Sequence, residues 1–323
     1  MFVVTGAAGF IGSCIVARLN ELGIKDIILV DDVLSFSDPR KKNIANKKYA
    51  QYYDSHSFLG LVKQDKLPSA VSCLIHMGAC SSTTCMDAKF LNENNLEYTK
   101  TLAQWALKKN VRFIYASSAA TYGDGSCGYK DDEATTRRCQ PLNLYGKSKQ
   151  DFDIFALDHQ WLGQMVGLKF FNVFGPNEYH KEDMRSVICK AYPEVVKNGI
   201  MKLFKSYHPH YPDGGQMRDF IYIKDAVDVV LFFVENKNVN GLFNVGTGKA
   251  RTWNDLALAL FKAAGKRADI KYYDMPEFLR PKYQYFTEAD MEKLKKAGYQ
   301  KSFTTLEDGI MDYVKYLRDQ KCW

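Results

Sequence analysis

The segment Gly6-Ala7-Ala8-Gly9-Phe10-Ile11-Gly12 lies between an apolar run, Phe2 to Thr5, and a stretch whose apolar residues recur at helical spacing. This pattern predicts a strand, a tight glycine turn and a helix. Glycine permits positive φ at the turn, and its missing side chain lets a pyrophosphate approach the amides at a helix N-terminus. An ordinary strand-to-helix turn also uses glycine, so the triplet Gly6, Gly9 and Gly12 alone is a weak signal for a dinucleotide site.

A second apolar strand strengthens the dinucleotide interpretation. Ile27-Ile28-Leu29-Val30 ends at Asp31, about 20 residues beyond the last glycine, where a carboxylate can accept hydrogen bonds from an adenosine ribose. The following Asp32 adds negative charge where a 2′-phosphate would require cations. The cations at positions 40–42 could fold back to provide them. These residues therefore permit NAD and NADP alike.

Composition and charge narrow the class of protein. The 323 residues are 46% hydrophobic and 25% charged, which is typical of a well-packed globular chain. The formal charge of +7 suits a small anionic substrate but is too dispersed to indicate nucleic-acid binding, and a solvated basic surface explains it as well. The eight cysteines form no Cys-x-x-Cys pair, so we expect reduced thiols and no metal site. With no basic leader and no long uncharged apolar run, we expect a cytoplasmic protein without a membrane span.

Strand and helix patterns alternate in the first half of the chain. We expect a helix near 58–67, a buried strand at 72–76, a long helix at 88–109 and a strand at 111–116, with a weaker strand near 49–53. This alternation predicts an α/β fold with a doubly wound parallel sheet and right-handed crossovers. The small-residue loop 78–84 follows the strand at 72–76, and such loops at the carboxyl ends of parallel strands bind ligands.

Catalytic chemistry is indicated by three residues. Ser118 closes a predicted strand, and Tyr145 and Lys149 are spaced i and i+4, so on a helix they share one face. An ammonium group near a phenol lowers the pKa of the phenol from about 10, as a general acid–base requires. Ser118 could hydrogen-bond the same substrate oxygen. The alternative is an ordinary exposed helical pair, but the upstream dinucleotide signal favours the catalytic interpretation.

These motifs resemble the extended short-chain dehydrogenase/reductase family, and the likeness spans nearly the whole chain. The blocks that carry it are Gly78-Ala79-Cys80-Ser81-Ser82-Thr83-Thr84, Tyr115-Ala116-Ser117-Ser118-Ala119-Ala120-Thr121-Tyr122-Gly123, Phe171-Asn172-Val173-Phe174-Gly175-Pro176, His180-Lys181 and Tyr283-Gln284-Tyr285-Phe286-Thr287. Within the family, the Ala-Cys-Ser-Ser-Thr-Thr loop and the His-Lys pair are most similar to the epimerases that act on an ADP-linked heptose.

The resemblance implies an isomerase of lipopolysaccharide core synthesis that inverts C6 of the heptose with bound NADP. Inversion requires proton handling on both faces of a transient carbonyl, which one base cannot easily serve. Tyr145 is one candidate, and the resemblance supplies Lys181 as the second. Taken alone, Lys181 is a surface lysine beside Glu182 and Asp183. The resemblance further implies that Lys149 orients the nicotinamide ribose.

Further contacts are implied by the resemblance alone. Besides the glycines, Asp31, Lys149 and Lys181, the implied cofactor contacts are Phe10, Ile11, Asp32, Lys41, Gly78, Ala79, Cys80, Asn95 and Val173. The implied substrate contacts are Ser81, Asn172, Asp183, Lys190, Phe204, Arg218 and Tyr283. Family members place serine and histidine where this chain has Asp183 and Lys190.

Arg218 is assigned by this resemblance to the diphosphate, which a planar guanidinium can contact in bidentate fashion. The alternatives are an arginine paired with Asp219 and a Tyr283 buried in the core. We expect a dinucleotide-binding domain at 1–172 with 219–247, and a smaller interleaved substrate-binding lobe at 173–218 with 248–323.

Other functions stay open at this point. Ala119 and Ala120 follow Ser118 where related dehydratases carry an acid, so elimination of water is not expected. A UDP-hexose 4-epimerase or another nucleotide-sugar reductase would share the glycine turn, Ser118, Tyr145 and Lys149. A cofactor sensor without catalytic activity would usually lack the tyrosine or the lysine. The resemblance also implies a homo-oligomer, namely a pentamer.

Overall fold

The computed structural model describes residues 1–33, 37–277, 279–280 and 283–323. Its centre is a seven-stranded sheet with the order β10-β6-β5-β4-β1-β2-β3, in which every pair is parallel. The strands are β1 (Phe2–Thr5), β2 (Ile27–Val30), β3 (Gln51–Tyr53), β4 (Cys73–His76), β5 (Arg112–Ser118), β6 (Val166–Phe170) and β10 (Gly241–Val245). The predicted doubly wound parallel sheet is confirmed.

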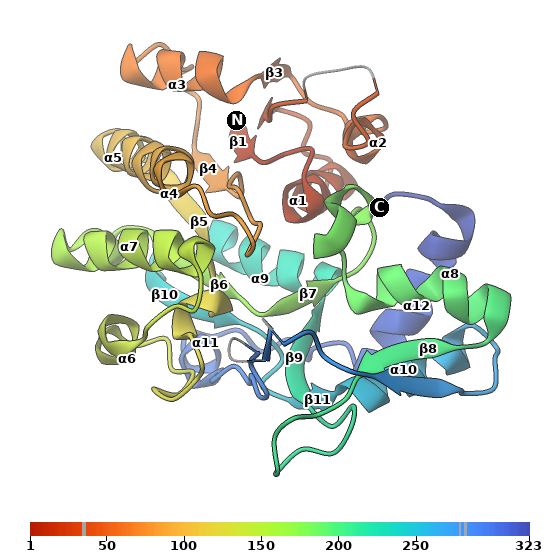
Figure 1. The fold of residues 1–323 in the computed structure, drawn as a ribbon. Coiled ribbons are helices and arrows are strands. Elements are labelled where there is room, and N and C mark those ends of the chain that lie inside the picture. Colours follow the sequence, from red (N-terminus) through yellow and green to blue (C-terminus); the bar gives the residue numbers. More distant parts are fainter. Residues whose placement is uncertain (34–36, 278, 281–282) are drawn as a thin grey trace.

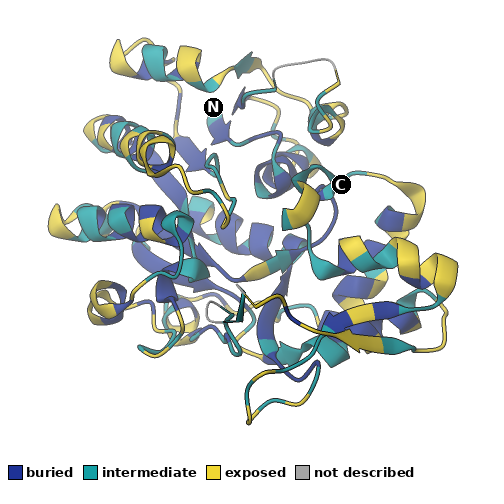
Figure 2. Ribbon diagram, in the orientation of Figure 1, coloured by how far each residue is buried: buried dark blue, intermediate teal, exposed yellow. Residues whose placement is uncertain are grey.

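Helices cover both faces of this sheet (Figure 1). The helices α3 (Ser55–Lys63), α5 (Tyr98–Lys108) and α7 (Leu144–Asp158) lie on one face, and α1 (Phe10–Glu21) and α9 (Ile223–Glu235) lie on the other. Because side chains alternate along a strand, neighbours such as Val3 and Val4 enter separate cores on the two faces. Figure 2 shows strands such as β2, β4 and β6 buried, which explains their mostly apolar sequences, whereas the edge strand β3 is partly exposed.

A second group of elements packs beside the carboxyl ends of the central strands (Figure 1). It contains the sheet β11-β9-β7, the parallel pair β12-β8 and the helices α8, α10 and α12. Their bounds are β7 (Asn172–Phe174), β8 (Met201–Phe204), β9 (Met217–Tyr222), β11 (Ala250–Thr252), β12 (Ile270–Tyr273), α8 (Val187–Asn198), α10 (Trp253–Ala263) and α12 (Leu306–Asp319). The domain boundaries given above stay a prediction.

Several short elements differ from the sequence-based prediction. The helix expected at 88–109 is divided into α4 (Ala88–Leu91), the π-helix η1 (Asn92–Glu97) and α5. The strands β7 and β11 and the helices α2 (Lys41–Ile44), α6 (Glu133–Arg138) and α11 (Glu292–Lys296) either were not predicted or have different bounds. Elements this short carry too few residues for a periodic pattern, and tertiary contacts determine them. No helix in the described part of the chain combines the length and apolar character needed to cross a bilayer.

Strand order reverses between β1 and β4, which are neighbours in the sheet although β2 and β3 separate them in sequence. At such a switch point the loops that follow the two strands diverge and leave a crevice. The glycine turn follows β1 and the loop 77–87 follows β4. The fold therefore brings together the two segments that the sequence analysis singled out for ligand binding.

Candidate active site

A glycine cradle lies at the end of β1. Gly6 has φ +64°, and a Cβ on Gly12 would lie 2.1 Å from the carbonyl oxygen of Gly6. A Cβ on Gly6 would lie 2.7 Å from the backbone nitrogen of Gly78, at the start of the second loop. Helix α1 begins after Gly9 without a side-chain cap and without an acidic residue in its first turn. The cradle fits the pyrophosphate of a dinucleotide, which an open helix N-terminus stabilises.

Asp31 lies at the edge of this cradle, where β2 ends. Its carboxylate accepts hydrogen bonds from the backbone nitrogens of Ala8 and Asp32, at 2.9 and 2.8 Å, and from Arg40 Nη1 at 2.8 Å. Burial raises the pKa of Asp31, while the bond from Ala8 and the charge of Arg40 oppose that rise. Arg40 also pairs with Asp38 at 2.7 Å. The guanidinium of Arg40 thus folds back on this edge, as the sequence allowed.

A cavity of about 880 Å³ extends from the glycine cradle to Trp253 and Gln284 of the second group of elements. Most predicted site residues line it: Gly6, Gly9, Phe10, Ile11, Gly12, Asp31, Asp32, Gly78, Ala79, Cys80, Ser81, Ser118, Tyr145, Lys149, Asn172, Val173 and Lys181. The remaining predicted site residues, namely Lys41, Asn95, Asp183, Lys190, Phe204, Arg218 and Tyr283, do not line it.

Ser118, Tyr145 and Lys149 meet at one wall of the cavity. Helix α7 begins at Leu144 because the Asn143 side chain caps it, and this places Tyr145 in its first turn. The phenol of Tyr145 lies beside Ser118, which lowers the pKa of the phenol, but burial has the larger effect and raises it. The Lys149 ammonium donates to the carbonyl oxygen of Ala116 at 2.8 Å. The expected lowering of the phenol pKa by Lys149 is therefore wrong for these groups, since burial dominates.

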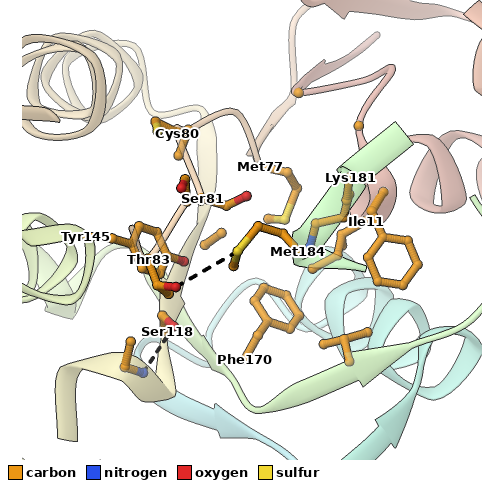
Figure 3. Close-up of a pocket in the computed structure, with 18 of the residues that line it drawn as sticks. Ile11, Met77, Cys80, Ser81, Thr83, Ser118, Tyr145, Phe170, Lys181 and Met184 are labelled. Atoms are coloured by element: carbon orange, nitrogen blue, oxygen red, sulfur yellow. Dashed lines mark hydrogen bonds between the residues drawn. The ribbon is translucent and has the colours of Figure 1, made fainter. Parts of the chain in front are cut away.

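Lys181 faces this wall from the other side of the cavity. Figure 3 shows Tyr145 and Ser118 on one side, Lys181 on the other and Met184 between them. The 3-10 segment η4 (Tyr179–Met184) is interrupted at Glu182, where φ is +46°. Lys181 Nζ lies 5.4 Å from the ring centroid of Phe10, and burial lowers the pKa of the amine. The described residues offer no carboxylate within 4.0 Å of Lys181 Nζ.

Asn95 acts behind the cavity wall. It is buried in the π-helix, and its amide exchanges hydrogen bonds with the backbone nitrogen and oxygen of Cys80, at 2.9 and 3.0 Å. It also donates to Ser148 Oγ at 3.0 Å. Asn95 therefore holds the loop after β4 against α7. The sequence could not indicate this arrangement, because the three residues are far apart in the chain.

A buried histidine that sequence analysis did not single out joins the same elements. His76 Nδ1 lies 2.6 Å from Thr5 Oγ1, and His76 Nε2 lies 2.8 Å from Thr99 Oγ1. Thr99 donates to the carbonyl oxygen of Asn95, and Thr5 accepts from the Gly78 amide. All four of these hydrogen bonds can form together only if the imidazole of His76 is neutral and protonated at Nε2. Burial lowers the pKa of His76 to about 3, which agrees with that state.

On the substrate side, Arg218 lies behind the cavity among aromatic rings. Its guanidinium lies 5.2 Å from the ring centroid of Tyr283 and 5.8 Å from that of Trp253, and burial lowers its pKa. Asp219 is not its partner, since that carboxylate accepts from the backbone of Thr247 and from two other amides. Trp253 Nε1 donates to the Tyr283 hydroxyl at 3.0 Å. A buried cation without a carboxylate can receive an anionic ligand.

The region of Asp183 and Lys190 is exposed to solvent. Lys190 Nζ donates to the carbonyl oxygen of Asp183 at 3.1 Å, and neither residue lines the cavity. Their neighbours Met184 and Arg185 line it instead. Thr83 Oγ1 lies 3.9 Å from the sulfur of Met184 (Figure 3), so the loop after β4 touches this segment across the cavity. Phe204, which also lies outside the lining, packs on Tyr273 with ring centroids 4.8 Å apart.

A parallel sheet with a glycine cradle and a Ser–Tyr–Lys set beside it defines a dinucleotide-dependent enzyme of the short-chain dehydrogenase/reductase type. More specifically, the chain belongs to the NAD dependent epimerase/dehydratase family, whose sequence model matches residues 2–246.

Curated relatives and a solved structure are similar over nearly the full length. The chain is 56% identical over 315 residues to a Nitratidesulfovibrio vulgaris (strain DP4) protein named ADP-L-glycero-D-manno-heptose-6-epimerase, covering 98% of this chain and 97% of the relative. A Fusobacterium nucleatum protein of the same name is 45% identical, with 98% and 97% coverage. The crystal structure of Helicobacter pylori ADP-L-glycero-D-manno-heptose-6-epimerase has a TM-score of 0.81 at 29% identity, covering 98% of this chain and 96% of that one.

Proposed function

We propose that this protein is an epimerase that inverts C6 of the heptose in ADP-D-glycero-D-manno-heptose, giving ADP-L-glycero-D-manno-heptose for lipopolysaccharide core synthesis. The observation that carries the proposal is the pair of ionisable groups, Tyr145 and Lys181, on facing walls of one cavity beside a dinucleotide cradle. The names of the relatives with 56% and 45% identity support the choice of substrate.

The two facing groups suit an inversion that conserves the oxidation state. A nicotinamide dinucleotide whose pyrophosphate lies at the glycine cradle would supply reversible removal of hydride from C6. Tyr145, which lines the cavity beside Ser118, handles the proton on the C6 oxygen when that oxygen points to its wall. Lys181 handles the proton after the carbon has presented its other face. Because burial lowers the pKa of Lys181, its neutral amine is more accessible at neutral pH than that of a solvated lysine.

Substrate recognition is proposed for the second wall and the residues behind it. Arg218 would pair with the diphosphate, because it is a buried guanidinium that no carboxylate of the described residues pairs with. Asn172 and Ser81 line the cavity, where they can bond sugar hydroxyls. Phe204 and Tyr283 would contact the nucleoside from the layer behind. For Asp183 and Lys190, which lie outside the cavity, only a rearrangement of their segment would bring contact with the sugar.

The proposed activity can be tested with two nucleotide sugars. Purified protein is incubated with ADP-D-glycero-D-manno-heptose or with UDP-galactose, and proton NMR follows the configuration at C6 or C4. We expect inversion of the heptose and no change in the galactose. Inversion of UDP-galactose instead would indicate a hexose 4-epimerase. Tight dinucleotide binding without turnover of either sugar would indicate a cofactor sensor.

We infer that the cofactor is NADP. Support comes from Arg40, whose guanidinium lines the cavity at the edge where the adenosine ribose would lie. The carboxylates of Asp31 and Asp38 compete for the same guanidinium, so a 2′-phosphate would have to displace at least one of them. The mass of the dinucleotide released on denaturing fresh protein tests this inference. Release of the form without the extra phosphate would assign NAD.

We propose further that the chain works in the cytoplasm as a homo-oligomer, with a pentamer as the form that the resemblance implies. Light scattering coupled to size-exclusion chromatography measures the molar mass in solution. A molar mass equal to that of one chain would contradict the assembly.

We also propose the division into a domain at 1–172 with 219–247 and a lobe at 173–218 with 248–323, which limited proteolysis can test.

A further inference from the structure

A fully buried ion pair lies beneath the wall that carries Ser118 and Tyr145. Lys169 Nζ on β6 lies 2.7 Å from Asp153 Oδ2 on α7, and neither side chain has any exposed surface. Removing two charges from water costs several kcal/mol per ion, and this cost is recovered only when geometry and hydrogen bonding are good. Packing alone therefore does not explain why two charged residues occupy this buried position.

Every polar atom of the pair has a partner. Asp153 accepts from the Tyr115 hydroxyl at 2.8 Å and from Ser117 Oγ at 2.7 Å, in addition to Lys169. Lys169 donates to Thr121 Oγ1 at 2.9 Å. The pair thus ties helix α7 to the neighbouring strands β5 and β6 and to the turn after β5. Such a satisfied buried network has one arrangement, because any shift would leave a charge unpaired.

The network is continuous with the proposed catalytic groups. Asp153 stands one helical turn beyond Lys149, on the same face of α7. Lys149 donates to the carbonyl oxygen of Ala116, which lies between the two β5 residues that donate to Asp153. Helix α7 is therefore fastened to three consecutive residues of β5. The next residue of that strand is Ser118, which lines the cavity beside Tyr145.

We propose that Asp153, paired with Lys169, is a positioning residue of this site: it fixes Tyr145 and Lys149 of α7 against Ser118 and supplies the negative charge that balances the buried Lys149 ammonium. The proposal rests on the proposed function for the roles of Tyr145 and Lys149. It goes beyond that function because Asp153 does not line the cavity.

The charges around Lys149 support the electrostatic part of the proposal. The ionisable groups that interact with its charge are Asp153 on α7, His76 on β4 and Cys80 in the loop after β4. Tyr115 on β5 and Lys169 on β6 contact Asp153. Burial keeps His76 and Tyr115 uncharged at neutral pH, because it lowers the pKa of His76 to about 3 and raises that of Tyr115. Burial lowers the pKa of Lys149 to about 8, and Asp153 is the main group that opposes this effect.

The test replaces both members of the pair. Asp153→Asn alone would leave Lys169 as an unpaired buried charge, so the double variant Asp153→Asn with Lys169→Met is used, which removes both charges at similar volume. Protein labelled with carbon-13 at lysine Cε gives the titration of Lys149, assigned by the resonance that Lys149→Met lacks. We expect Lys149 to titrate at lower pH in the double variant, and turnover at pH 7 to fall by about tenfold or more.

Matched controls separate charge from packing. Tyr115→Phe and Ser117→Ala each remove one hydrogen bond to Asp153 and leave its charge. We expect the Lys149 titration of both to match the parent. An unchanged titration in the double variant, or an equal shift in Tyr115→Phe, would overturn the proposal. If the double variant does not fold, Asp153→Glu displaces the carboxylate but keeps the charge; lowered turnover with parental titration is then expected, and parental turnover would overturn the positioning role.

The titration needs neither substrate nor cofactor. A parent protein that fails to invert ADP-heptose would therefore contradict the proposed function, while the titration would still report on Asp153. Conversely, normal epimerisation together with an unmoved Lys149 titration would contradict only the role of Asp153.

Discussion

Lys181 differs from the surface lysines of the chain in its surroundings. Its amine is largely buried over the ring of Phe10, and burial lowers its pKa, whereas Lys197 at the end of α8 is exposed. We expect Lys181→Met to leave dinucleotide binding intact and to slow inversion on the order of 10²-fold or more, because one face of the carbonyl loses its proton carrier. Stopped assays of C6 inversion and cofactor fluorescence measure the two effects.

Two companion variants complete this test. Tyr145→Phe should slow inversion on the same scale, since it removes the acid–base group of the facing wall. Lys197→Met should leave inversion at the parental rate. Near-parental turnover in Lys181→Met would remove the mechanism with two bases and leave Tyr145 to serve both faces.

His76 gives the free energy of unfolding a defined dependence on pH. Its pKa is lowered to about 3 in the folded protein, from an ordinary value of 6.5. Between these two values the unfolded chain binds the proton more readily, so the free energy of unfolding falls as the pH drops from about 6.5 toward 3. We expect His76→Gln to reduce this slope in urea titrations at several pH values, even if the variant is less stable at pH 7.

The matched control is His56→Gln, which changes an exposed histidine on α3. It should keep the parental slope. The proposed neutral state of His76 would be wrong if the His76→Gln and parent proteins lost stability equally steeply between pH 6.5 and 3.

Individual site residues were predictable from the sequence to different extents. Tyr145 and Lys149 are close in sequence on one helix, so their shared face followed from spacing alone. Their electrostatics did not, because the pKa of Tyr145 depends on burial and that of Lys149 on Asp153 as well. The role of Asn95 as support for the Cys80 loop depends on contacts between distant segments, which no local pattern encodes.

At the scale of single elements, the turn between β1 and α1 depends on close backbone approach. A Cβ on Gly12 would lie 2.1 Å from the Gly6 carbonyl oxygen, which is backbone and cannot move aside cheaply. We expect Gly12→Ala to displace the start of α1 and to abolish copurification of the dinucleotide. Absorbance and mass of the released nucleotide, together with the urea midpoint, measure the effect.

Gly60 provides the control for this substitution. It lies inside α3, and a Cβ there would meet nothing within 4 Å. Gly60→Ala should therefore retain the dinucleotide and gain about 0.5–1 kcal/mol in free energy of unfolding, because alanine is the better helix former. Full dinucleotide content in Gly12→Ala would show that the tight turn is not needed for the cradle.

The larger elements were predictable because their apolar patterns are continuous. Strands such as β1 and β2 are buried on both faces and therefore consist of uninterrupted apolar residues. The break of the helix expected at 88–109 was not predictable. Asn95 in its π-helical part bonds Cys80, and Thr99 at the start of α5 bonds His76. Long-range hydrogen bonds of this kind override helical propensity.

On the scale of the whole molecule, the cavity lies between the central sheet and the second group of elements. The central sheet contributes the glycine cradle and the Tyr145 wall, while the sheet β11-β9-β7 carries Arg218 behind the far end. The sequence predicts in general terms that anionic ligands bind at both ends of the cavity, because the glycine turn and Arg218 are each assigned to a diphosphate. That Arg218 is buried with no carboxylate partner in the part of the chain that the structure describes did not follow, since Asp219 is adjacent in sequence yet bonds elsewhere.

Because Arg218 is buried, we expect its replacement to raise the free energy of unfolding and to weaken ligand binding. A guanidinium buried without an anionic partner lowers the free energy of unfolding, so Arg218→Met should unfold at higher urea concentration than the parent. The same variant should bind ADP about tenfold or more weakly, since hydrogen bonds to charged groups contribute roughly 1.5–3 kcal/mol. Titration calorimetry with ADP and urea unfolding without ligand measure the two quantities.

Arg251 is the matched control, because it stands directly opposite Arg218 in the register of β11 and β9. It is ion-paired with Glu307 at 2.6 Å and with Asp255 at 3.2 Å. Arg251→Met should therefore lose up to about 1 kcal/mol of stability and keep the parental affinity for ADP. A loss of stability in both variants with unchanged ADP affinity would mean that Arg218 serves the fold. If Arg218→Met is more stable and Arg251→Met less stable than the parent, and only Arg218→Met binds ADP more weakly, then Arg218 lowers the stability of the fold and serves to bind the diphosphate.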